Sequence, residues 1–428
     1  MLRDIATCVW WCSTDHAGIQ GKALFGWTGQ GLPRNFVARN ARPGRMHIAF
    51  ITFTGLHPSG SWPATAASMA NALERQEHKV TRLQVSGISK PIYWQARKAL
   101  HMLAGQQFQA ERQESVAREL ADSVNERLRK LKVDLVLCSS SLPVPYLTTT
   151  APVAFWTDAT FAGMLGFYPE FSRLDRGTVN SGMALEAKAL QRADHAFYAS
   201  EWAARSAVRD HNADPRRVHV VPFGPNLAVE PDRVRVLDAI RKRSRKVCRL
   251  LFIGYDWERK QGPLVVRTQQ ELEQNGIATE LTIVGGTPEL DVDHRRIHVL
   301  GRLDKSDPAQ SAALEKAFRE AHFLVVPSQA ECYGMVYAEA SAHGIPSIAC
   351  ETGGVGTVVR QERNGRLFPS GVSAATLAGY IGTVWGDPDR YAELAIAARD
   401  EFDDRLNWAS AVEELVAVVE ARSSVHHA

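Results

Sequence analysis

The sequence predicts an α/β protein with two doubly wound domains, each built on a parallel sheet that helices cover on both faces. From Met46 onward, short apolar runs of strand composition alternate with amphipathic helical stretches. This alternation pauses at the Pro- and Gly-rich stretch PFGPNLAVEPDR and then starts again, which indicates a boundary between two domains. Because ligands of such sheets bind beyond the carboxyl ends of the strands, we expect the site in a cleft that the two domains face.

The strand-like runs fall into two series, one on each side of that boundary. The first series comprises HIAFITF, HKVTRLQV, VDLVLCSS, PVAFWTD, HAFYAS and VHVVPF. The second comprises RLLFIGY, TELTIVGG, IHVLGR, HFLVVPS and PSIAC. We therefore place a first domain at 46–226, a second domain at 227–405 and a final helical segment at 406–428.

Residues 1–45 have no sustained helix or strand period, unlike the rest of the chain. A buried strand follows them at once, so we expect Met46 to be the functional start and 1–45 to be a disordered extension. Cys8, Cys12 and His16 are spaced to share one helix face, but a zinc site needs a fourth ligand, and we expect no metal site.

The composition is that of a globular protein with large cores: 428 residues, 45% hydrophobic and 23% charged. A net charge of +3 is too small to indicate nucleic-acid binding. The apolar runs are all far shorter than the ~20 residues of a membrane-spanning helix. Six scattered cysteines resemble no disulfide framework, and the N-terminus resembles no export signal. We therefore expect a cytoplasmic enzyme.

Residues 233–249 form a strongly basic segment, with eight Lys or Arg residues and one acid, Asp238. Two interpretations stay open. The segment is a solvated helix at the start of the second domain, or it contacts an acidic acceptor or the inner face of a membrane as a peripheral protein.

The most informative stretch is PSQAECYGMVYAEASAHGIPSIACETGGVGTVV. A strand, a loop containing ECYG and a helix that stops at Gly344 are expected in succession. Gly334 therefore lies near a helix N-terminus, where unpaired amides and the helix dipole favour a diphosphate. Glu331 in the loop and Glu339 inside the helix could bracket a ligand that lies across the helix start.

This stretch resembles the E-x7-E signature of family 4 retaining glycosyltransferases (glycosyl transferases group 1), which have the GT-B fold of two Rossmann-like domains. The resemblance implies that Glu331 faces the donor sugar and that Glu339 holds the ribose hydroxyls. It also implies that the amides around Gly334, Met335 and Val336 approach the diphosphate and the sugar. The long run E-C-Y-G-x-x-x-x-E-A-S-A-x-G-x-P argues against the alternative of two glutamates on a solvated helix.

A second candidate stretch, FIGYDWERKQGP, has a strand ending at Gly254 and then a loop with Arg259 and Lys260. Two cations at the end of a strand can neutralise a departing diphosphate, although a surface basic pair is the alternative. The stretch resembles the G-R-L-x-x-x-K-G loop of the family, with Lys260 on the lysine. Tyr255 fills the usual arginine position, and we expect Arg259 to take over that role.

A third stretch, TGLHPSGSWPATAAS, carries Gly and Pro before a helix, so its backbone amides would face the cleft. It resembles the S-W-S-G-T loop of one subset of family 4, with Pro63 and Ala64 in place of the usual Ser and Gly. Ser61, Trp62 and Thr65 are therefore candidates for an acceptor-side or phosphate-binding loop, and Trp62 could stack on a sugar.

A fourth candidate, Asp158, ends a strand in the stretch AFWTDATFAGM and would point toward the cleft. Many relatives carry a His or Asp of the catalytic site at this place, so the resemblance implies a catalytic role. The alternative is a helix N-cap, because Asp often precedes an Ala-rich helix.

The resemblance extends over residues 46–420. It implies that the first domain shapes the acceptor site and that the second domain binds the donor. It also implies that the segment 406–428 packs back on the first domain. The expected reaction is transfer of a sugar from a nucleotide-diphosphate sugar to an unidentified saccharide, lipid-linked or small-molecule acceptor. The resemblance implies retention at the anomeric carbon and no metal or other cofactor. A sugar-nucleotide epimerase and a non-catalytic sugar-nucleotide-binding protein remain alternatives.

Overall fold

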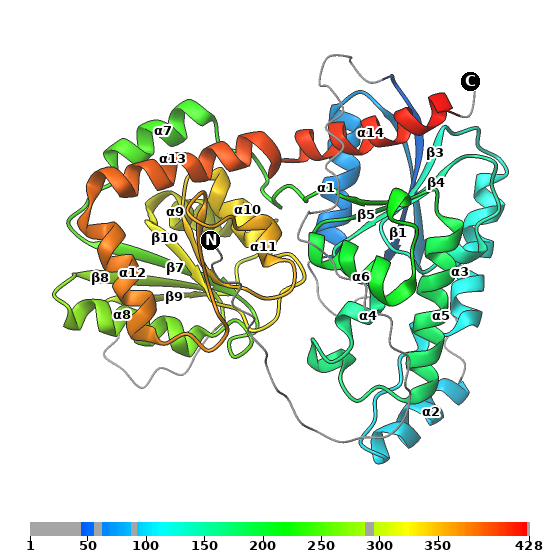
Figure 1. Cartoon of the computed structure of the whole chain (residues 1–428), viewed down its shortest axis with the longest axis horizontal. Helices are drawn as coiled ribbons and strands as arrows, with labels where there is room; N and C mark the ends of the chain where they lie inside the picture. Colours follow the sequence, from blue (N-terminus) through cyan, green and yellow to red (C-terminus); the bar gives the residue numbers. More distant parts are fainter. Residues whose placement is uncertain (1–43, 55–61, 87–91, 287–294, 426–428) are drawn as a thin grey trace, which may run out of the picture. The chain divides into compact units, whose positions relative to one another are not determined.

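The computed structural model describes residues 44–54, 62–86, 92–286 and 295–425 and contains two parallel sheets of six strands each (Figure 1). The predicted α/β class with two doubly wound domains is therefore confirmed. Residues 1–43 of the expected disordered extension, including the Cys8, Cys12 and His16 group, lie outside the described residues. The first strand begins at His47, directly after Met46.

The first sheet has the strand order β2-β1-β3-β4-β5-β6. Its strands are β1 (His47–Thr54), β2 (Lys79–Ser86), β3 (Leu135–Cys138), β4 (Val153–Thr157), β5 (His195–Tyr198) and β6 (Val218–Val220). The accompanying helices are α1 (Trp62–Arg75), α2 (Ile92–Leu103), α3 (Glu114–Leu128), α4 (Phe161–Met164), α5 (Arg176–Arg192) and α6 (Glu201–His211).

The second sheet has the strand order β12-β11-β10-β7-β8-β9. Its strands are β7 (Cys248–Gly254), β8 (Thr279–Gly285), β9 (Ile297–Gly301), β10 (Phe323–Val326), β11 (Ser347–Cys350) and β12 (Gly365–Phe368). Its helices are α7 (Arg233–Lys242), α8 (Gly262–Gln274), α9 (Pro308–Glu320), α10 (Met335–Ala342), α11 (Val355–Val358), α12 (Ala374–Gly386) and α13 (Pro388–Arg405). The short edge strand β12 was not among the expected strands.

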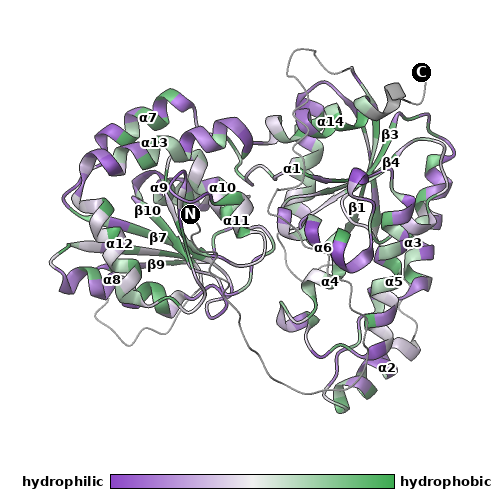
Figure 2. Cartoon of the chain, in the orientation of Figure 1, coloured by the Kyte–Doolittle hydropathy of each residue, from purple (hydrophilic) through white to green (hydrophobic). Residues whose placement is uncertain are grey.

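The central strands are apolar because both faces of each sheet are covered. Every residue of β3, β5, β10 and β11 is buried, as expected for parallel sheets. Figure 2 shows largely hydrophobic strands in both sheets, whereas the helices around them carry hydrophilic as well as hydrophobic residues. Strand ends are therefore the places where polar side chains of the sheets can gather.

The last helix, α14 (Trp408–Val425), packs on α1 of the first domain. Its first residue, Trp408, contacts the rings of Trp156 and Phe223, with ring centroids 5.7 and 5.8 Å away. The indole Nε1 of Trp408 also donates a hydrogen bond of 2.8 Å to the carbonyl of Pro225. Gly224 allows this approach, because a Cβ there would lie 2.5 Å from the Trp408 nitrogen.

Most basic residues of the segment 233–249 interact with other residues of the second domain. Arg233 pairs with Asp400 and Asp403 of α13, and Arg245 lies 4.4 Å over the ring of Trp385. Lys242, Arg243 and Arg249 also have acidic or carbonyl partners. These contacts favour the interpretation of a helix that begins the second domain. In the part of the chain that the structure describes, every helix is too short or too polar to cross a membrane.

Candidate active site at the strand ends

The second sheet changes its direction of winding between two central strands, β7 and β10, which pair directly. From β7 the chain continues to β8 and β9 on one side, and from β10 it continues to β11 and β12 on the other. Ligands of doubly wound sheets bind at such a switch point. The loop with Arg259 and Lys260 follows β7, and the loop with Glu331 follows β10, so topology brings together residues that are about seventy positions apart.

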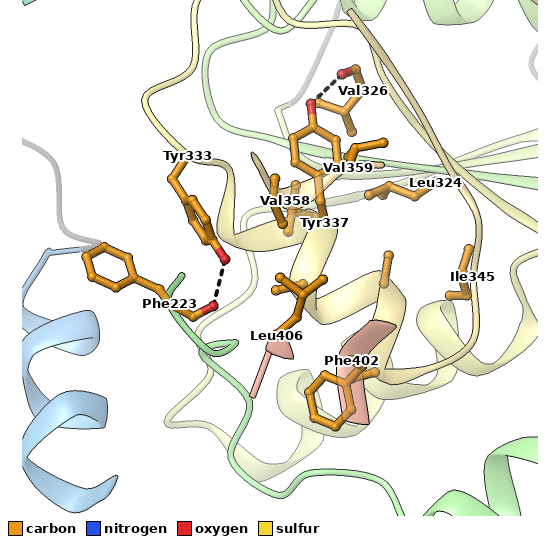
Figure 3. Close-up of a cluster of buried hydrophobic side chains, with 14 of the residues drawn as sticks. Phe223, Leu324, Val326, Tyr333, Tyr337, Ile345, Val358, Val359, Phe402 and Leu406 are labelled. Atoms are coloured by element: carbon orange, nitrogen blue, oxygen red, sulfur yellow. Dashed lines mark hydrogen bonds between the residues drawn. The ribbon is translucent and has the colours of Figure 1, made fainter. Parts of the chain in front are cut away.

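Two buried tyrosines hold the loop between β10 and α10 in place (Figure 3). The hydroxyl of Tyr333 donates a 2.7 Å hydrogen bond to the carbonyl of Phe223, and that of Tyr337 donates one of 2.7 Å to Val326. Between them, Gly334 caps the helix with φ +89°. A Cβ on Gly334 would lie 2.4 Å from the ring of Tyr337, so only glycine fits at this helix start.

The paired glycines after β11 lie against the backbone of the same loop. The amide of Gly354 donates a 3.0 Å hydrogen bond to the carbonyl of Glu331. A Cβ on Gly354 would lie 1.9 Å from the carbonyl oxygen of Cys332. The G-G pair therefore has a structural role in this loop, because it lets two backbones approach closely.

Glu331 and Lys260 form a nearly buried ion pair. Their side chains are 14% and 12% exposed, and the Lys260 Nζ pairs with the Glu331 Oε2. The side chain of Lys260 crosses the end of its own strand at Gly254, where a Cβ would lie 2.9 Å from the Lys260 Cγ. This burial argues against the interpretation of Lys260 as a surface charge.

Arg259 lies beside the same carboxylate, with its Nη1 3.6 Å from the Glu331 Oε2. The guanidinium also donates a 2.6 Å hydrogen bond to the carbonyl of Ala330 and contacts Asp256 at 3.2 Å. Both predicted cations therefore surround one carboxylate. Tyr255, at the usual arginine position of the family, is exposed, and Arg302 lies 5.0 Å over its ring.

Asp158 directly follows β4 and lies near this group. Burial, together with the nearby charge of Glu331, raises the pKa of its carboxyl to about 6. The N-cap alternative is wrong, because the cap of α4 is Thr160, whose hydroxyl accepts a hydrogen bond from the amide of Gly163.

The raised pKa of Asp158 gives a prediction about stability. Its unfolded pKa is near 3.9, so the folded state holds the proton more tightly, and ionisation opposes folding. The free energy of unfolding of the wild type, relative to Asp158→Asn, should therefore fall as the pH rises from about 4 to about 6, by on the order of 2 kcal/mol. Urea unfolding of both proteins across this range measures the difference. Parallel curves would show that Asp158 ionises normally.

Tyr168, which the sequence analysis missed, joins the first domain to the Glu331 loop. Its hydroxyl accepts a 3.0 Å hydrogen bond from the amide of Cys332, and the Arg259 guanidinium lies 5.2 Å over its ring. Burial raises the pKa of Tyr168, so it stays a neutral phenol. The sequence signal was weak, because Tyr168 lies in an aromatic stretch after Asp158 with no regular period.

Glu339 lies inside α10, as expected, and is buried. Its Oε1 is 2.7 Å from the Nζ of Lys305, a residue that the sequence analysis did not single out. Lys305 also donates a 2.8 Å hydrogen bond to the carbonyl of Asn226, in the segment between the domains. Glu331 and Glu339 therefore have different cationic partners. The position of Lys305, shortly after strand β9, is the signal that could have identified it.

The candidate residues of the first-domain loop lie near the segment between the domains. Ser61 is outside the described residues. Trp62 begins α1 and packs edge-on against Phe223, with ring centroids 6.2 Å apart. Thr65 is buried, and its hydroxyl accepts a 3.0 Å hydrogen bond from the side-chain amide of Asn226. Their roles toward a sugar or phosphate stay predictions.

Residues 247–387 match the family model described as Glycosyl transferases group 1. The chain is 30% identical over 229 residues to the D-inositol 3-phosphate glycosyltransferase of Xylanimonas cellulosilytica, covering 50% of this chain and 54% of the relative. It is 32% identical over 232 residues to that of Acidothermus cellulolyticus, covering 50% of each chain. The chain thus spans about half the length of these curated relatives.

Solved structures with the same fold are glycosyltransferases. Sucrose-phosphate synthase from Thermosynechococcus elongatus aligns with a TM-score of 0.62 and 17% identity, over 89% of this chain and 99% of that one. Anabaena HepE in complex with UDP-glucose aligns with a TM-score of 0.56 and 16% identity, over 89% and 100%. The chain therefore has the GT-B fold. Within it, residues 247–387 match the group 1 glycosyltransferase model, which confirms the predicted resemblance over this part of the chain.

Proposed function

We propose that the protein transfers a sugar from a nucleotide-diphosphate sugar to an acceptor hydroxyl, with retention at the anomeric carbon. The observation that carries this proposal is the pair of cations, Lys260 and Arg259, around Glu331 at the switch point of the second sheet. A leaving diphosphate gains charge as its bond to the sugar breaks, and cations at that place stabilise the transition state. The HepE structure in complex with UDP-glucose supports a donor of this class.

In the proposed mechanism, the bond between the anomeric carbon and the diphosphate oxygen breaks while the acceptor oxygen bonds to the same carbon. The acceptor proton passes to the departing phosphate. Lys260 and Arg259 exchange the carboxylate of Glu331 for the phosphate oxygens, and Glu331 is then available to the sugar hydroxyls. The amides of Gly334, Met335 and Val336 at the start of α10 add to the positive potential.

Glu339 binds the ribose hydroxyls in this proposal, and it first has to share or release Lys305. Asp158, close to Glu331 and with a raised pKa, faces the reacting sugar. No metal ion takes part in the proposed reaction.

The proposal is tested by incubating the full chain with UDP-, GDP- and ADP-sugars, with and without a crude acceptor extract, and measuring released nucleotide. Acceptor-dependent release from one donor is the expected result. A changed sugar nucleotide without any release would instead indicate an epimerase. Tight binding without any turnover would indicate a sugar-nucleotide-binding protein, which the exposed Tyr255 at the usual arginine position also allows.

A further inference from the structure

A basic pocket of the second domain lies at the amino end of strand β7. It has a volume of about 250 Å³, and the charged residues that line it are Lys242, Arg243, Arg249, Arg319 and Glu320. They come from the end of α7, the loop after it, the start of β7 and the end of α9. The loop of the candidate active site follows the other, carboxyl end of β7, so this pocket is a separate place in the domain.

Two of the four cations that line the pocket have carboxylate partners. Lys242 is 2.7 Å from Asp238, and Arg249 is 3.0 Å from Glu280. Both pairs are partly exposed and contribute little to stability. Among the lining residues, Glu320 alone is acidic. The charge of the pocket therefore depends on the other two arginines.

Arg243 and Arg319 have no carboxylate to balance their charge. The guanidinium of Arg243 donates hydrogen bonds of 2.6 and 2.9 Å to the carbonyls of His343 and Gly344. Its third acceptor, 3.1 Å away, is the hydroxyl of Tyr391, and its buried Nε has no partner in the described residues. Arg319 has neither an ion pair nor a side-chain hydrogen bond within the described ranges. Buried N–H groups and charges without partners indicate a place for a ligand or an ion.

The buried His322, directly before β10, is affected by the same imbalance of charge. Its Nδ1 accepts a 3.0 Å hydrogen bond from the amide of Arg249, so the imidazole lies next to the start of β7. Burial, together with the charges of Arg243, Arg249 and Arg245, lowers the pKa of His322 to about 3. The arginines at this end of the sheet therefore produce a positive potential that the nearby acids do not cancel.

We propose that this pocket binds a small phosphate-bearing anion, either inorganic phosphate or a small phosphate ester. Arginine and lysine are the side chains that bind phosphate, and the nearly two negative charges of a phosphate group would balance Arg243 and Arg319. The volume of the pocket is below the ~300–1,000 Å³ of sites for drug-sized ligands, so the anion is small.

Arg243 connects the pocket to helix α10. This helix begins at Met335, directly after Gly334 of the candidate active site, and Arg243 binds the carbonyls of the two residues that follow its last residue, Ala342. An anion in the pocket would contact the residue that holds this end of α10, whereas Gly334 lies at the other end. Binding of the anion requires neither donor nor turnover, so the proposal does not depend on the proposed function.

Isothermal titration calorimetry of the full chain at constant ionic strength tests the proposal. The probes are inorganic phosphate and glycerol 3-phosphate, with acetate as an anion that has no phosphate group. The variant Lys242→Gln/Arg319→Gln removes two exposed cations of the pocket. The control Arg235→Gln/Arg241→Gln removes two exposed cations of α7 that do not line the pocket. Lys260→Ala identifies phosphate that binds in the candidate active site, and thermal unfolding verifies that all variants are folded.

We expect the wild type, the control and Lys260→Ala to bind phosphate alike at this pocket, and Lys242→Gln/Arg319→Gln to bind it about tenfold more weakly or worse. The ester arm shows whether the pocket also contacts the organic part of a ligand, in which case glycerol 3-phosphate binds more tightly than inorganic phosphate. The proposal is overturned if the wild type binds neither phosphate probe, or if acetate binds as tightly as phosphate. It is also overturned if both double variants lose binding equally, or if only Lys260→Ala loses it.

Discussion

Replacing Lys260 with alanine is expected to lower turnover of an identified donor about 100-fold or more. The lysine is nearly buried at the end of β7 and pairs with Glu331, so its charge lies where the proposed reaction releases the diphosphate. The affinity for the bare nucleoside diphosphate should decrease by a smaller factor than turnover does. The reason is that the charge on the phosphate grows toward the transition state. Single-turnover rates and calorimetry measure the two effects.

The control for this variant is Lys316→Ala, which removes an exposed lysine of α9 in the same domain. Lys260→Ala leaves Glu331 with Arg259 alone, so we also expect a loss of stability of about 1–3 kcal/mol. Thermal unfolding separates this loss from the loss of rate. Turnover of Lys260→Ala close to that of Lys316→Ala would contradict the role of Lys260 in leaving-group departure.

The two glutamates of the α10 region are expected to respond differently to the same substitution. Glu339→Gln should weaken the bare nucleoside diphosphate and the sugar donor alike, about tenfold or more, because the charged hydrogen bonds to the ribose are lost in both. Glu331→Gln should leave affinity for the bare diphosphate unchanged or tighter, because the phosphate no longer competes with this carboxylate for Lys260. Its turnover should fall, since Glu331 contacts only the reacting sugar in the proposal.

Calorimetry with the bare diphosphate on both variants decides between these roles, and each variant is the control for the other because both replace a carboxylate with an amide. Loss of the nucleotide in Glu331→Gln as severe as in Glu339→Gln would overturn the assignment. Equal, unchanged affinity in both would show that Glu339 does not bind the ribose.

The local features of the candidate site could be predicted from the sequence because neighbouring residues determine them. The helix start at Gly334, the loop position of Glu331 and the position of Glu339 inside the helix follow from a strand, a glycine loop and a helix stop in succession. The alternation of apolar runs likewise predicts two parallel sheets. β12 was missed because its sequence, GRLF, is short and contains an arginine.

The partners of these residues could not be predicted, because they come from distant parts of the chain. Lys260 meets Glu331 only because β7 and β10 pair at the centre of the sheet. Lys305 reaches Glu339 from the end of β9, and Tyr168 reaches Cys332 from the first domain. The raised pKa of Asp158 depends on its burial and on Glu331, and neither is visible in the residues around position 158.

By itself the sequence determined the fold class, the two series of strands and the positions of Glu331, Gly334, Glu339 and Lys260 within their elements. Apolar periodicity and the positions of glycines determine local structure over a few residues. Only a small number of folds can bury all of the apolar runs of such a chain. Only the tertiary structure decided which charges pair, because the partners lie far apart in the sequence and meet only when the strands of the sheet have come together.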